Sequence, residues 1–307
     1  MKISIVGAGN VGGTAALRVA QENIGDVVLI DVVPGMAKGK GLDLADSRWL
    51  TGKNYQLTGT DDISGLKGSD IVVITAGLAR KPGMTREDLL NKNSQILKSV
   101  CVKVKELAAN AVVIIVTNPL DVMTYFAVKS LEFKPGRVFG MGVTLDASRF
   151  ANLISEQLSV AVTDIQPVVA GCHGEGMLPL ARFTRIKNKA LTEIITDKSR
   201  IDELVNRTVD RGKEIVSLLG SGSAYYAPSA AICQLVKAVA KDEKLTLGVS
   251  AYLNGEYGLK DITVGVPCLI GRNGVENIVE LDLNPEEKSA FIKSAESIRQ
   301  LTKSLAF

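Results

Sequence analysis

The first half of the chain alternates short runs of consecutive apolar residues with longer stretches in which apolar residues recur at helical spacing. The runs at 70–75 and 112–117 are apolar on successive residues, as expected of strands that helices cover on both faces. Between them, residues 93–109 carry apolar side chains three and four positions apart, which predicts a helix. This alternation is typical of βαβ units around a parallel sheet. We expect its strands at residues 2–6, 27–30, 70–75, 112–117 and 137–139.

The rhythm changes after about residue 143. Two segments rich in β-branched and apolar residues, 246–252 and 262–270, predict antiparallel strands, and a turn is expected at 271–274. The other expected elements are a strand at 166–170, a strand-like stretch near 180–190, and helices at 147–158, 200–219, 224–241 and 286–304. We therefore predict an α/β protein with a parallel-sheet domain at residues 1–143 and an α+β domain at residues 144–307.

Composition narrows the classes of protein that remain. The 307 residues are 46% apolar and 22% charged, which is typical of a soluble globular protein, and the net charge of +3 does not favour nucleic acid or a membrane surface as partner. No apolar stretch is long enough to span a bilayer, and the chain enters a strand directly after Met1, so we expect a cytoplasmic protein. The four cysteines form no CxxC pair, which argues against a disulfide framework or a zinc site, and we expect no metal.

A glycine-rich segment, Gly7-Ala-Gly9-Asn10-Val11-Gly12, joins the first predicted strand to a helix. Its glycines allow a tight turn, close approach of a pyrophosphate and close helix packing, and the helix N-terminus attracts phosphate. Asp31 ends the second strand at the distance expected of a carboxylate that binds the ribose hydroxyls and repels a 2′-phosphate. The pattern favours a Rossmann-type domain that binds NAD rather than NADP. An ordinary strand–helix turn and a solvated Asp31 are the alternatives; FAD uses the same motif, but the second half shows no further flavin motif.

His173 is the only histidine of the chain, and glycines flank its segment. Histidine titrates near neutral pH and is the commonest acid–base group, although a lone histidine is often structural. Asp146 and Arg149 lie three residues apart at the start of a predicted helix, on neighbouring parts of one face. Asp146 is also well placed as an N-cap, and Arg149 as the partner of an ion pair with Asp146. A nucleophilic pair of Cys172 with His173 is disfavoured, because neighbours in an extended chain point in opposite directions.

Two further segments follow predicted strands at the edge of the sheet where ligands bind in α/β proteins. The first, residues 76–89, is a long connection with Gly and Pro that carries Arg80 and Arg86, which suggests a mobile lid over an anionic substrate. A solvated basic loop is the alternative. In the second, Asn118 is placed to reach a ribose or a substrate hydroxyl, whereas Pro119 alone would simply start the next helix.

Together these stretches closely resemble the lactate/malate dehydrogenase family, and its malate branch in particular. The resemblance implies that His173 is the general base, that Asp146 holds its tautomer, and that Arg149 binds the C1 carboxylate. It also implies that Arg86 polarises the carbonyl oxygen and that Asn118 orients substrate and cofactor. The residues expected to bind NAD are Gly7, Gly9, Asn10, Val11, Gly12, Asp31, Thr75, Ala76, Gly77, Asn93, Val116 and Asn118.

Arg80 indicates the substrate. Malate enzymes of the family resemble each other in carrying arginine here, where lactate enzymes carry glutamine, because a second carboxylate needs a second cation. With pyruvate bound, Arg80 would be buried without a partner, at a cost of roughly 3–5 kcal/mol. Ala224, near where lactate enzymes carry threonine, favours malate as well. The resemblance therefore implies reversible hydride transfer between (S)-malate and oxaloacetate, a reaction of the tricarboxylic acid cycle.

The sequence departs from the family pattern at Ala79, Cys172 and Glu175-Gly176, where proline, glycine and Asp-Thr or Asp-Ser are expected. Two alternatives stay open: a dehydrogenase for lactate or another 2-hydroxy acid, and an NAD-binding protein without turnover. The second would not need His173, Asp146 and Arg149 together. The resemblance also implies a homo-oligomer, dimer or tetramer, and the helix around residues 41–49 is a candidate contact surface.

Overall fold

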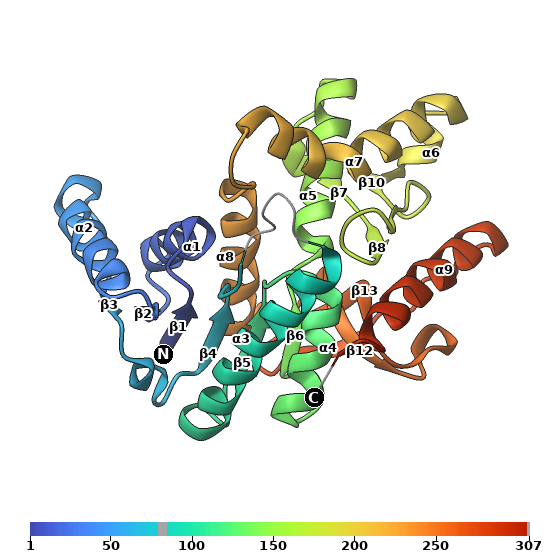
Figure 1. Cartoon of the computed structure of the whole chain (residues 1–307). Coiled ribbons are helices and arrows are strands. Elements are labelled where there is room, and N and C mark those ends of the chain that lie inside the picture. The colour runs from blue at the N-terminus through green and yellow to red at the C-terminus, as the bar shows by residue number, and fades with distance from the viewer. Residues whose placement is uncertain (79–84, 306–307) are drawn as a thin grey trace.

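The computed structural model describes residues 1–78 and 85–305, and within this part most strands join one large sheet (Figure 1). Its strand order is β3-β2-β1-β4-β5-β6-β12-β13-β8-β9, with β14 beside β13. The first six strands pair in parallel, and the later ones are antiparallel. The fold class predicted from the pattern is confirmed.

The parallel half contains six strands and four α-helices among the described residues. Helices join successive strands because the central strands, such as β4 and β5, are apolar on both faces and must be covered on each side. The strands are β1 (Lys2–Val6), β2 (Asp26–Ile30), β3 (Leu57–Thr60), β4 (Ile71–Ile74), β5 (Val112–Ile115) and β6 (Val138–Gly140). The helices are α1 (Asn10–Gln21), α2 (Met36–Thr51), α3 (Arg86–Leu107) and α4 (Leu120–Leu131), with the short 3₁₀ helix η1 (Ile63–Leu66).

The expected strands of this half lie within two residues of the observed ones at either end. The predicted helix at 93–109 begins earlier, at Arg86, because Thr85 caps it. The Thr85 hydroxyl accepts from the backbone N–H of Asp88, and the Asp88 carboxylate accepts from the backbone N–H of Thr85. This capping box satisfies two backbone donors and fixes the start of α3.

The second half adds an antiparallel sheet to the edge of the parallel one. Ser250 of β12 pairs with Gly140 of β6, so one sheet continues from the first half into the second. The strands are β7 (Ile165–Gln166), β8 (Val169–Gly171), β9 (Met177–Pro179), β10 (Arg185–Ile186), β11 (Lys189–Ala190), β12 (Leu245–Asn254), β13 (Lys260–Gly271) and β14 (Gly274–Ile278). The helices are α5 (Val143–Leu158), α6 (Leu191–Ile194), α7 (Lys198–Leu219), α8 (Tyr226–Ala240) and α9 (Pro285–Thr302), with the 3₁₀ helices η2 (Val162–Asp164) and η3 (Glu256–Gly258).

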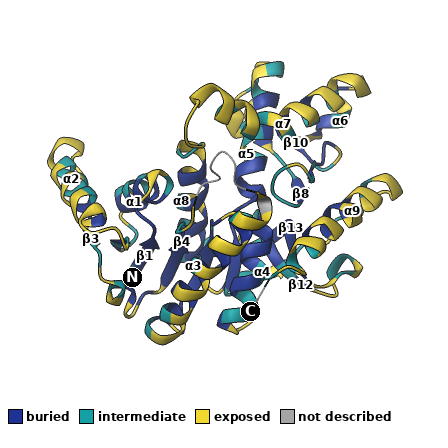
Figure 2. Ribbon diagram, in the orientation of Figure 1, coloured by how far each residue is buried: buried dark blue, intermediate teal, exposed yellow. Residues whose placement is uncertain are grey.

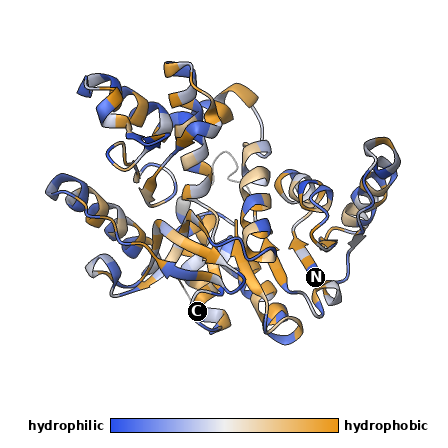
Figure 3. Ribbon diagram, turned by 180° about the vertical axis from the view of Figure 1, so that it is seen from behind, coloured by the Kyte–Doolittle hydropathy of each residue, from blue (hydrophilic) through white to orange (hydrophobic). Residues whose placement is uncertain are grey.

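The two halves pack directly against each other. Helix α8 of the second half lies along α1 of the first (Figure 1). The Arg18 side chain donates from Nε to the Ser229 hydroxyl over 3.0 Å, and Lys237 lies 3.1 Å from Glu22. The strands and the inner helix faces are buried, whereas much of α2 is exposed (Figure 2). The hydrophobic residues accordingly concentrate on the sheet (Figure 3), and no helix of the described part is both long and apolar enough to cross a membrane.

Candidate active site

The glycine-rich turn after β1 has the geometry that a bound pyrophosphate requires. Gly7 has φ of +107°, a conformation that a side chain rarely adopts. A Cβ at Gly12 would lie 1.8 Å from the Gly7 carbonyl oxygen, so only glycine fits there. A Cβ at Gly9, by contrast, meets no described atom within 4 Å. The open space beside Gly9, at the N-terminus of α1, therefore fits close approach of a phosphate to the backbone.

Asp31 stands beside this turn, at the end of β2. Its Oδ2 accepts from the backbone N–H of Ala8 at 2.6 Å, and its Oδ1 from that of Val33 at 2.9 Å. Each carboxylate oxygen has a second lone pair, so Asp31 can hold the turn and still accept from ribose hydroxyls. Lys40 of α2 donates to the Ala8 carbonyl at 2.7 Å, a contact that sequence reasoning missed because nothing links residues 8 and 40 before the fold is known.

The other expected cofactor residues lie after the neighbouring strands β4 and β5. The Thr75 hydroxyl donates to the Gly7 carbonyl at 3.0 Å, which ties β4 to the glycine turn. Ala76 accepts from the Thr117 hydroxyl at 2.7 Å, and a Cβ at Gly77 would lie 2.7 Å from Cγ2 of Thr117. Val116 follows β5 directly. These segments form one shelf at the carboxyl edge of the sheet, next to the open face of Gly9.

Asn93 lies beneath this shelf and is 1% exposed. Its Oδ1 accepts from the backbone N–H of Leu78 at 2.8 Å, and its Nδ2 donates to the carbonyls of Leu78 and Asn118 at 3.2 and 2.7 Å. The amide is therefore committed to two backbone segments. It holds the backbone of Asn118, which lines the cavity described below.

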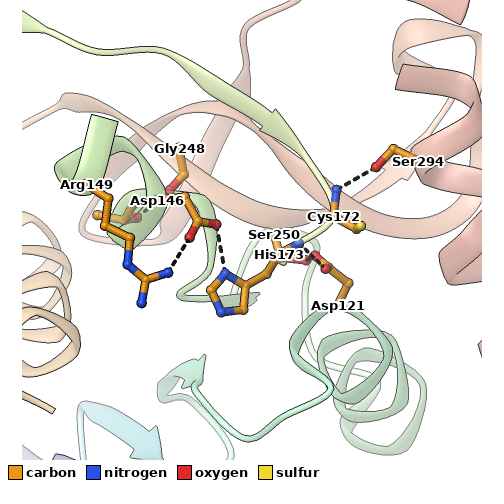
Figure 4. Close-up of polar contacts among 9 residues, drawn as sticks. Asp121, Asp146, Arg149, Cys172, His173, Gly248, Ser250 and Ser294 are labelled. Atoms are coloured by element: carbon orange, nitrogen blue, oxygen red, sulfur yellow. Dashed lines mark hydrogen bonds and ion pairs between the residues drawn. The ribbon is translucent and has the colours of Figure 1, made fainter. Parts of the chain in front are cut away.

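Three of the residues singled out for the chemistry, His173, Asp146 and Arg149, meet in the second half of the chain (Figure 4). His173 follows β8, and its Nδ1 lies 2.8 Å from Oδ2 of Asp146. The other oxygen of Asp146 accepts from Nη1 of Arg149 at 3.2 Å. Asp146 is fully buried, and Arg149 has a side-chain exposure of 11%. One carboxylate therefore holds both the imidazole and the guanidinium.

This geometry decides between the alternatives for Asp146 and Arg149. Helix α5 begins at Val143 with Gly142 as its N-cap, so the interpretation of Asp146 as an N-cap is wrong. The ion pair of Asp146 with Arg149 does form, but it is part of the histidine site and not an isolated surface pair. The Nε atom of Arg149 is buried and has no hydrogen-bond partner among the described residues. Such a donor fits a pocket whose anionic ligand completes the arrangement.

The surroundings of His173 raise the pKa of its imidazole. Desolvation lowers the pKa of the imidazole, but the charge of Asp146 and the hydrogen bond to it raise that pKa, and the net direction is upward. Burial lowers the pKa of Arg149, and Asp146 acts against that change. With Nδ1 facing Asp146, the proton that can be exchanged with a substrate is carried by Nε2 on the opposite side of the ring.

His173 and Asn118 both line a cavity of about 920 Å³ between α3, α4, α9 and the segment 172–178. Arg80 lies outside the described residues, as does Ala79, and the side chain of Arg86 at the start of α3 is not described. In the rest of the chain, no cluster of His, Cys, Asp or Glu has the arrangement of a metal site.

Both halves of the chain match a known protein family. Residues 1–140 match the NAD binding domain of lactate/malate dehydrogenase, and residues 143–306 match its alpha/beta C-terminal domain. The chain belongs to the lactate/malate dehydrogenase family.

Relatives within the family are similar over nearly the whole chain. A malate dehydrogenase of Roseiflexus sp. is 49% identical over 97% of this chain and 96% of its own. The crystal structure of malate dehydrogenase from Cryptosporidium parvum superposes with a TM-score of 0.95 at 41% identity, covering 99% of this chain and 98% of that one. The lactate dehydrogenase of the same organism, complexed with lactic acid and NAD, has a TM-score of 0.94 at 38% identity, with coverage of 98% and 96%.

Two departures from the family pattern, Cys172 and Gly176, lie next to each other. A Cβ at Gly176 would lie 2.4 Å from Sγ of Cys172, so a side chain at 176 would require the Cys172 side chain to move. The side chains of Cys172 and His173 point in opposite directions (Figure 4), although the backbone bends at these residues, just after the end of β8. Burial raises the pKa of the Cys172 thiol, which makes it a poor nucleophile. A Cys–His nucleophile pair is therefore not formed.

Proposed function

We propose that this member of the family is an NAD-dependent malate dehydrogenase that interconverts (S)-malate and oxaloacetate. The observation that carries the proposal is the contact of its only histidine with the buried Asp146, which also holds Arg149. A protein that only binds a dinucleotide has no need of this arrangement. Relatives named malate dehydrogenase at close to half identity support the same activity.

The proton of the substrate hydroxyl moves to Nε2 of His173 in malate oxidation and returns in oxaloacetate reduction. Asp146 keeps the Nδ1–H tautomer in the first state and stabilises the imidazolium in the second. Arg149 binds the C1 carboxylate through paired hydrogen bonds, and its buried setting strengthens them. Asn118, at the cavity wall beside His173, orients the substrate.

The choice of a dicarboxylate depends on Arg80, which lies outside the described residues, and Arg86 completes the substrate site as the group that polarises the carbonyl oxygen. Support for both comes from the sequence. A guanidinium at position 80 matches the C4 carboxylate of malate, and a monocarboxylate leaves it without a counter-charge.

The nucleotide site fits NAD. Gly7, Gly9 and Gly12 shape the turn, the N–H groups of Asn10 and Val11 begin α1, and Asp31 provides the carboxylate for the ribose. Thr75, Ala76, Gly77, Val116 and Asn118 form the shelf that would carry the nicotinamide, with Asn93 below it. When bound, NAD accepts the hydride that leaves C2 of malate.

We test this function by following NADH oxidation with oxaloacetate and with pyruvate in parallel, and then with NADPH. We expect kcat/KM to be at least about a hundredfold higher for oxaloacetate than for pyruvate, and NADH to be preferred over NADPH. A preference for pyruvate would favour a lactate dehydrogenase. No turnover with either acid would favour a binding protein.

We further propose that the chain forms a homo-oligomer in the cytoplasm and serves the tricarboxylic acid cycle. Helix α2 carries Leu42, Trp49 and Leu50 at 70, 88 and 79% exposure, an apolar surface that a second copy would cover. The four cysteines are all free, as in proteins of a reducing compartment.

A further inference from the structure

A second buried carboxylate lies on the side of His173 away from Asp146 (Figure 4). Asp121 belongs to the first turn of α4 and is 5% exposed. Its Oδ2 accepts from the backbone N–H of His173 at 2.8 Å, and its Oδ1 accepts from the Ser250 hydroxyl at 2.7 Å. The single histidine is thus held by one carboxylate at its ring and by another at its backbone.

The position of Asp121 is itself fixed by the antiparallel sheet. Ser250 lies on β12, and Thr263 on β13 donates from its hydroxyl to the Asp121 carbonyl at 2.6 Å. Asp121 also lies at the second position of α4, where the helix dipole favours a negative charge. A buried carboxylate is costly without partners, and here both of its oxygens have donors. The arrangement is therefore built to keep Asp121 in place.

The segment around His173 needs such support because its backbone is permissive. Gly171 and Gly174 have φ of +84° and +110°, which leaves little intrinsic order on either side of His173. Residue 172 is held separately, because its N–H donates to the Ser294 hydroxyl of α9 at 2.8 Å. At residue 173, the backbone contact is the one with Asp121.

Several charged and titratable groups surround the imidazole. Asp146 and Arg149 face it from α5, and Asp121 faces it from α4. Cys172 is its neighbour, and Glu175 and Lys293 line the same cavity. Like Asp146, Asp121 acts on His173 in the direction that raises the pKa of the imidazole. Burial raises the pKa of Asp121 itself, and the hydrogen bonds from Ser250 and from the His173 backbone act against that change.

We propose that Asp121 is a positioning residue for the proposed dehydrogenase reaction, fixing the backbone of His173 and supplying a second negative charge that favours the imidazolium. It acts through His173, from whose backbone N–H it accepts a hydrogen bond. The proposal rests on the function proposed above, but the titration of His173 tests the effect of Asp121 without turnover.

The test uses Asp121→Asn, which keeps an oxygen for the His173 N–H and an amide for the Ser250 hydroxyl while it removes the charge. Because the chain has one histidine, the imidazole gives a single ring titration in the NMR spectrum of the full-length protein. We expect the midpoint to fall by about one pH unit and kcat with oxaloacetate to fall about ten- to hundredfold, with the Kd of NADH unchanged. Asp202→Asn, at an exposed carboxylate of α7, is the matched control and leaves all three unchanged.

An unchanged titration midpoint together with a kcat within twofold of the wild type would overturn the proposal. Should Asp121→Asn not fold, the double variant Ser250→Ala with Thr263→Val loosens Asp121 and retains its carboxyl group. It is expected to lower kcat severalfold and leave the imidazole titration in place, and an unchanged kcat would refute the positioning role. A wild-type protein without turnover on oxaloacetate would remove the proposed function instead, while the titration of Asp121→Asn would still test the effect of the charge on His173.

Discussion

Removing the charge of Asp146 should move the pH dependence of the reaction as well as lower its rate. Asp146→Asn replaces a fully buried carboxylate whose Oδ2 lies 2.8 Å from Nδ1 of His173. In the imidazolium the charge is spread over the ring, so the two charges are about 4 Å apart, and at an effective dielectric constant of about 20 their attraction is about 4 kcal/mol. Even half of this amount corresponds to a pKa change of about 1.5 units.

The direction in which the pH profile moves follows from the protonation state of His173 that each direction of the reaction requires. Reduction of oxaloacetate requires the imidazolium, so kcat/KM falls as pH rises through the pKa of His173. In Asp146→Asn this fall is expected at least about one unit lower in pH. The rate near pH 7.5 is expected to drop about 10²- to 10⁴-fold, because the correct tautomer and the partner of Arg149 are lost as well.

The assay is kcat/KM for oxaloacetate from pH 5 to 10, with the Kd of NADH measured by calorimetry as a check of the fold. If kcat falls by the same factor at every pH and the profile does not move, Asp146 has no electrostatic role and only orients the ring. Thermal unfolding gives a second check. A His173 pKa raised in the folded state stabilises the protein fully below about 6.5, the unfolded value, and this contribution is lost as pH rises through the folded pKa. The difference in Tm between wild type and Asp146→Asn should therefore shrink with rising pH.

The remaining predictions concern the cofactor turn, the substrate and the assembly. Gly9→Ala should leave Tm unchanged and weaken the binding of NADH at least about tenfold, since its Cβ enters open space that the pyrophosphate needs. Gly12→Ala, whose Cβ would lie 1.8 Å from the Gly7 oxygen, should lower Tm as well. Equal losses of Tm in the two variants would contradict this role of the turn. Arg80→Gln should lower kcat/KM for oxaloacetate and raise it for pyruvate, changing their ratio about a hundredfold or more, and an unmoved ratio would remove Arg80 from substrate choice. Trp49→Glu should dissociate the oligomer, as measured by sedimentation. Because Trp49 is the only tryptophan, the fluorescence emission of the wild type should shift to longer wavelength when dilution dissociates the oligomer. A monomeric wild type would refute the contact surface.

Most of the large sheet was predictable because each strand carries its own pattern. The strands β1, β4 and β5 are runs of residues buried on both faces, so the apolar residues of each segment alone predict its burial. The strand β3 was missed because Leu57-Thr-Gly-Thr60 is short, mostly polar and only partly buried at the edge of the sheet. Its place is fixed by pairing with β2, which no local pattern shows.

The candidate site likewise contains residues that could be predicted from their own segment and residues that could not. The glycine turn, Asp31, His173, Asp146 and Arg149 were found because the first two form a motif of fixed spacing and the others combine chemistry with a family resemblance. The contact of Lys40 with the glycine turn joins residues 32 positions apart, and that of Ser250 with Asp121 spans 129. Such pairs come together only through the packing of whole elements. Neither side chain is unusual in its own segment, so the sequence alone gave no reason to select it.

The support of His173 explains why its segment is so rich in glycine. Its backbone is tied to α4 through Asp121, its ring to α5 through Asp146, and the preceding residue to α9 through Ser294. A segment held from three elements at once must adopt the backbone that these contacts dictate, including positive φ at Gly171 and Gly174, and glycine permits this with the least strain. Because α4 belongs to the first half of the chain and α5 and α9 to the second, the imidazole is fixed relative to the shelf after β4 and β5 by contacts from both halves. A substitution that distorts the sheet where β6 meets β12 should therefore lower kcat, which depends on proton transfer, more than it weakens the binding of NADH.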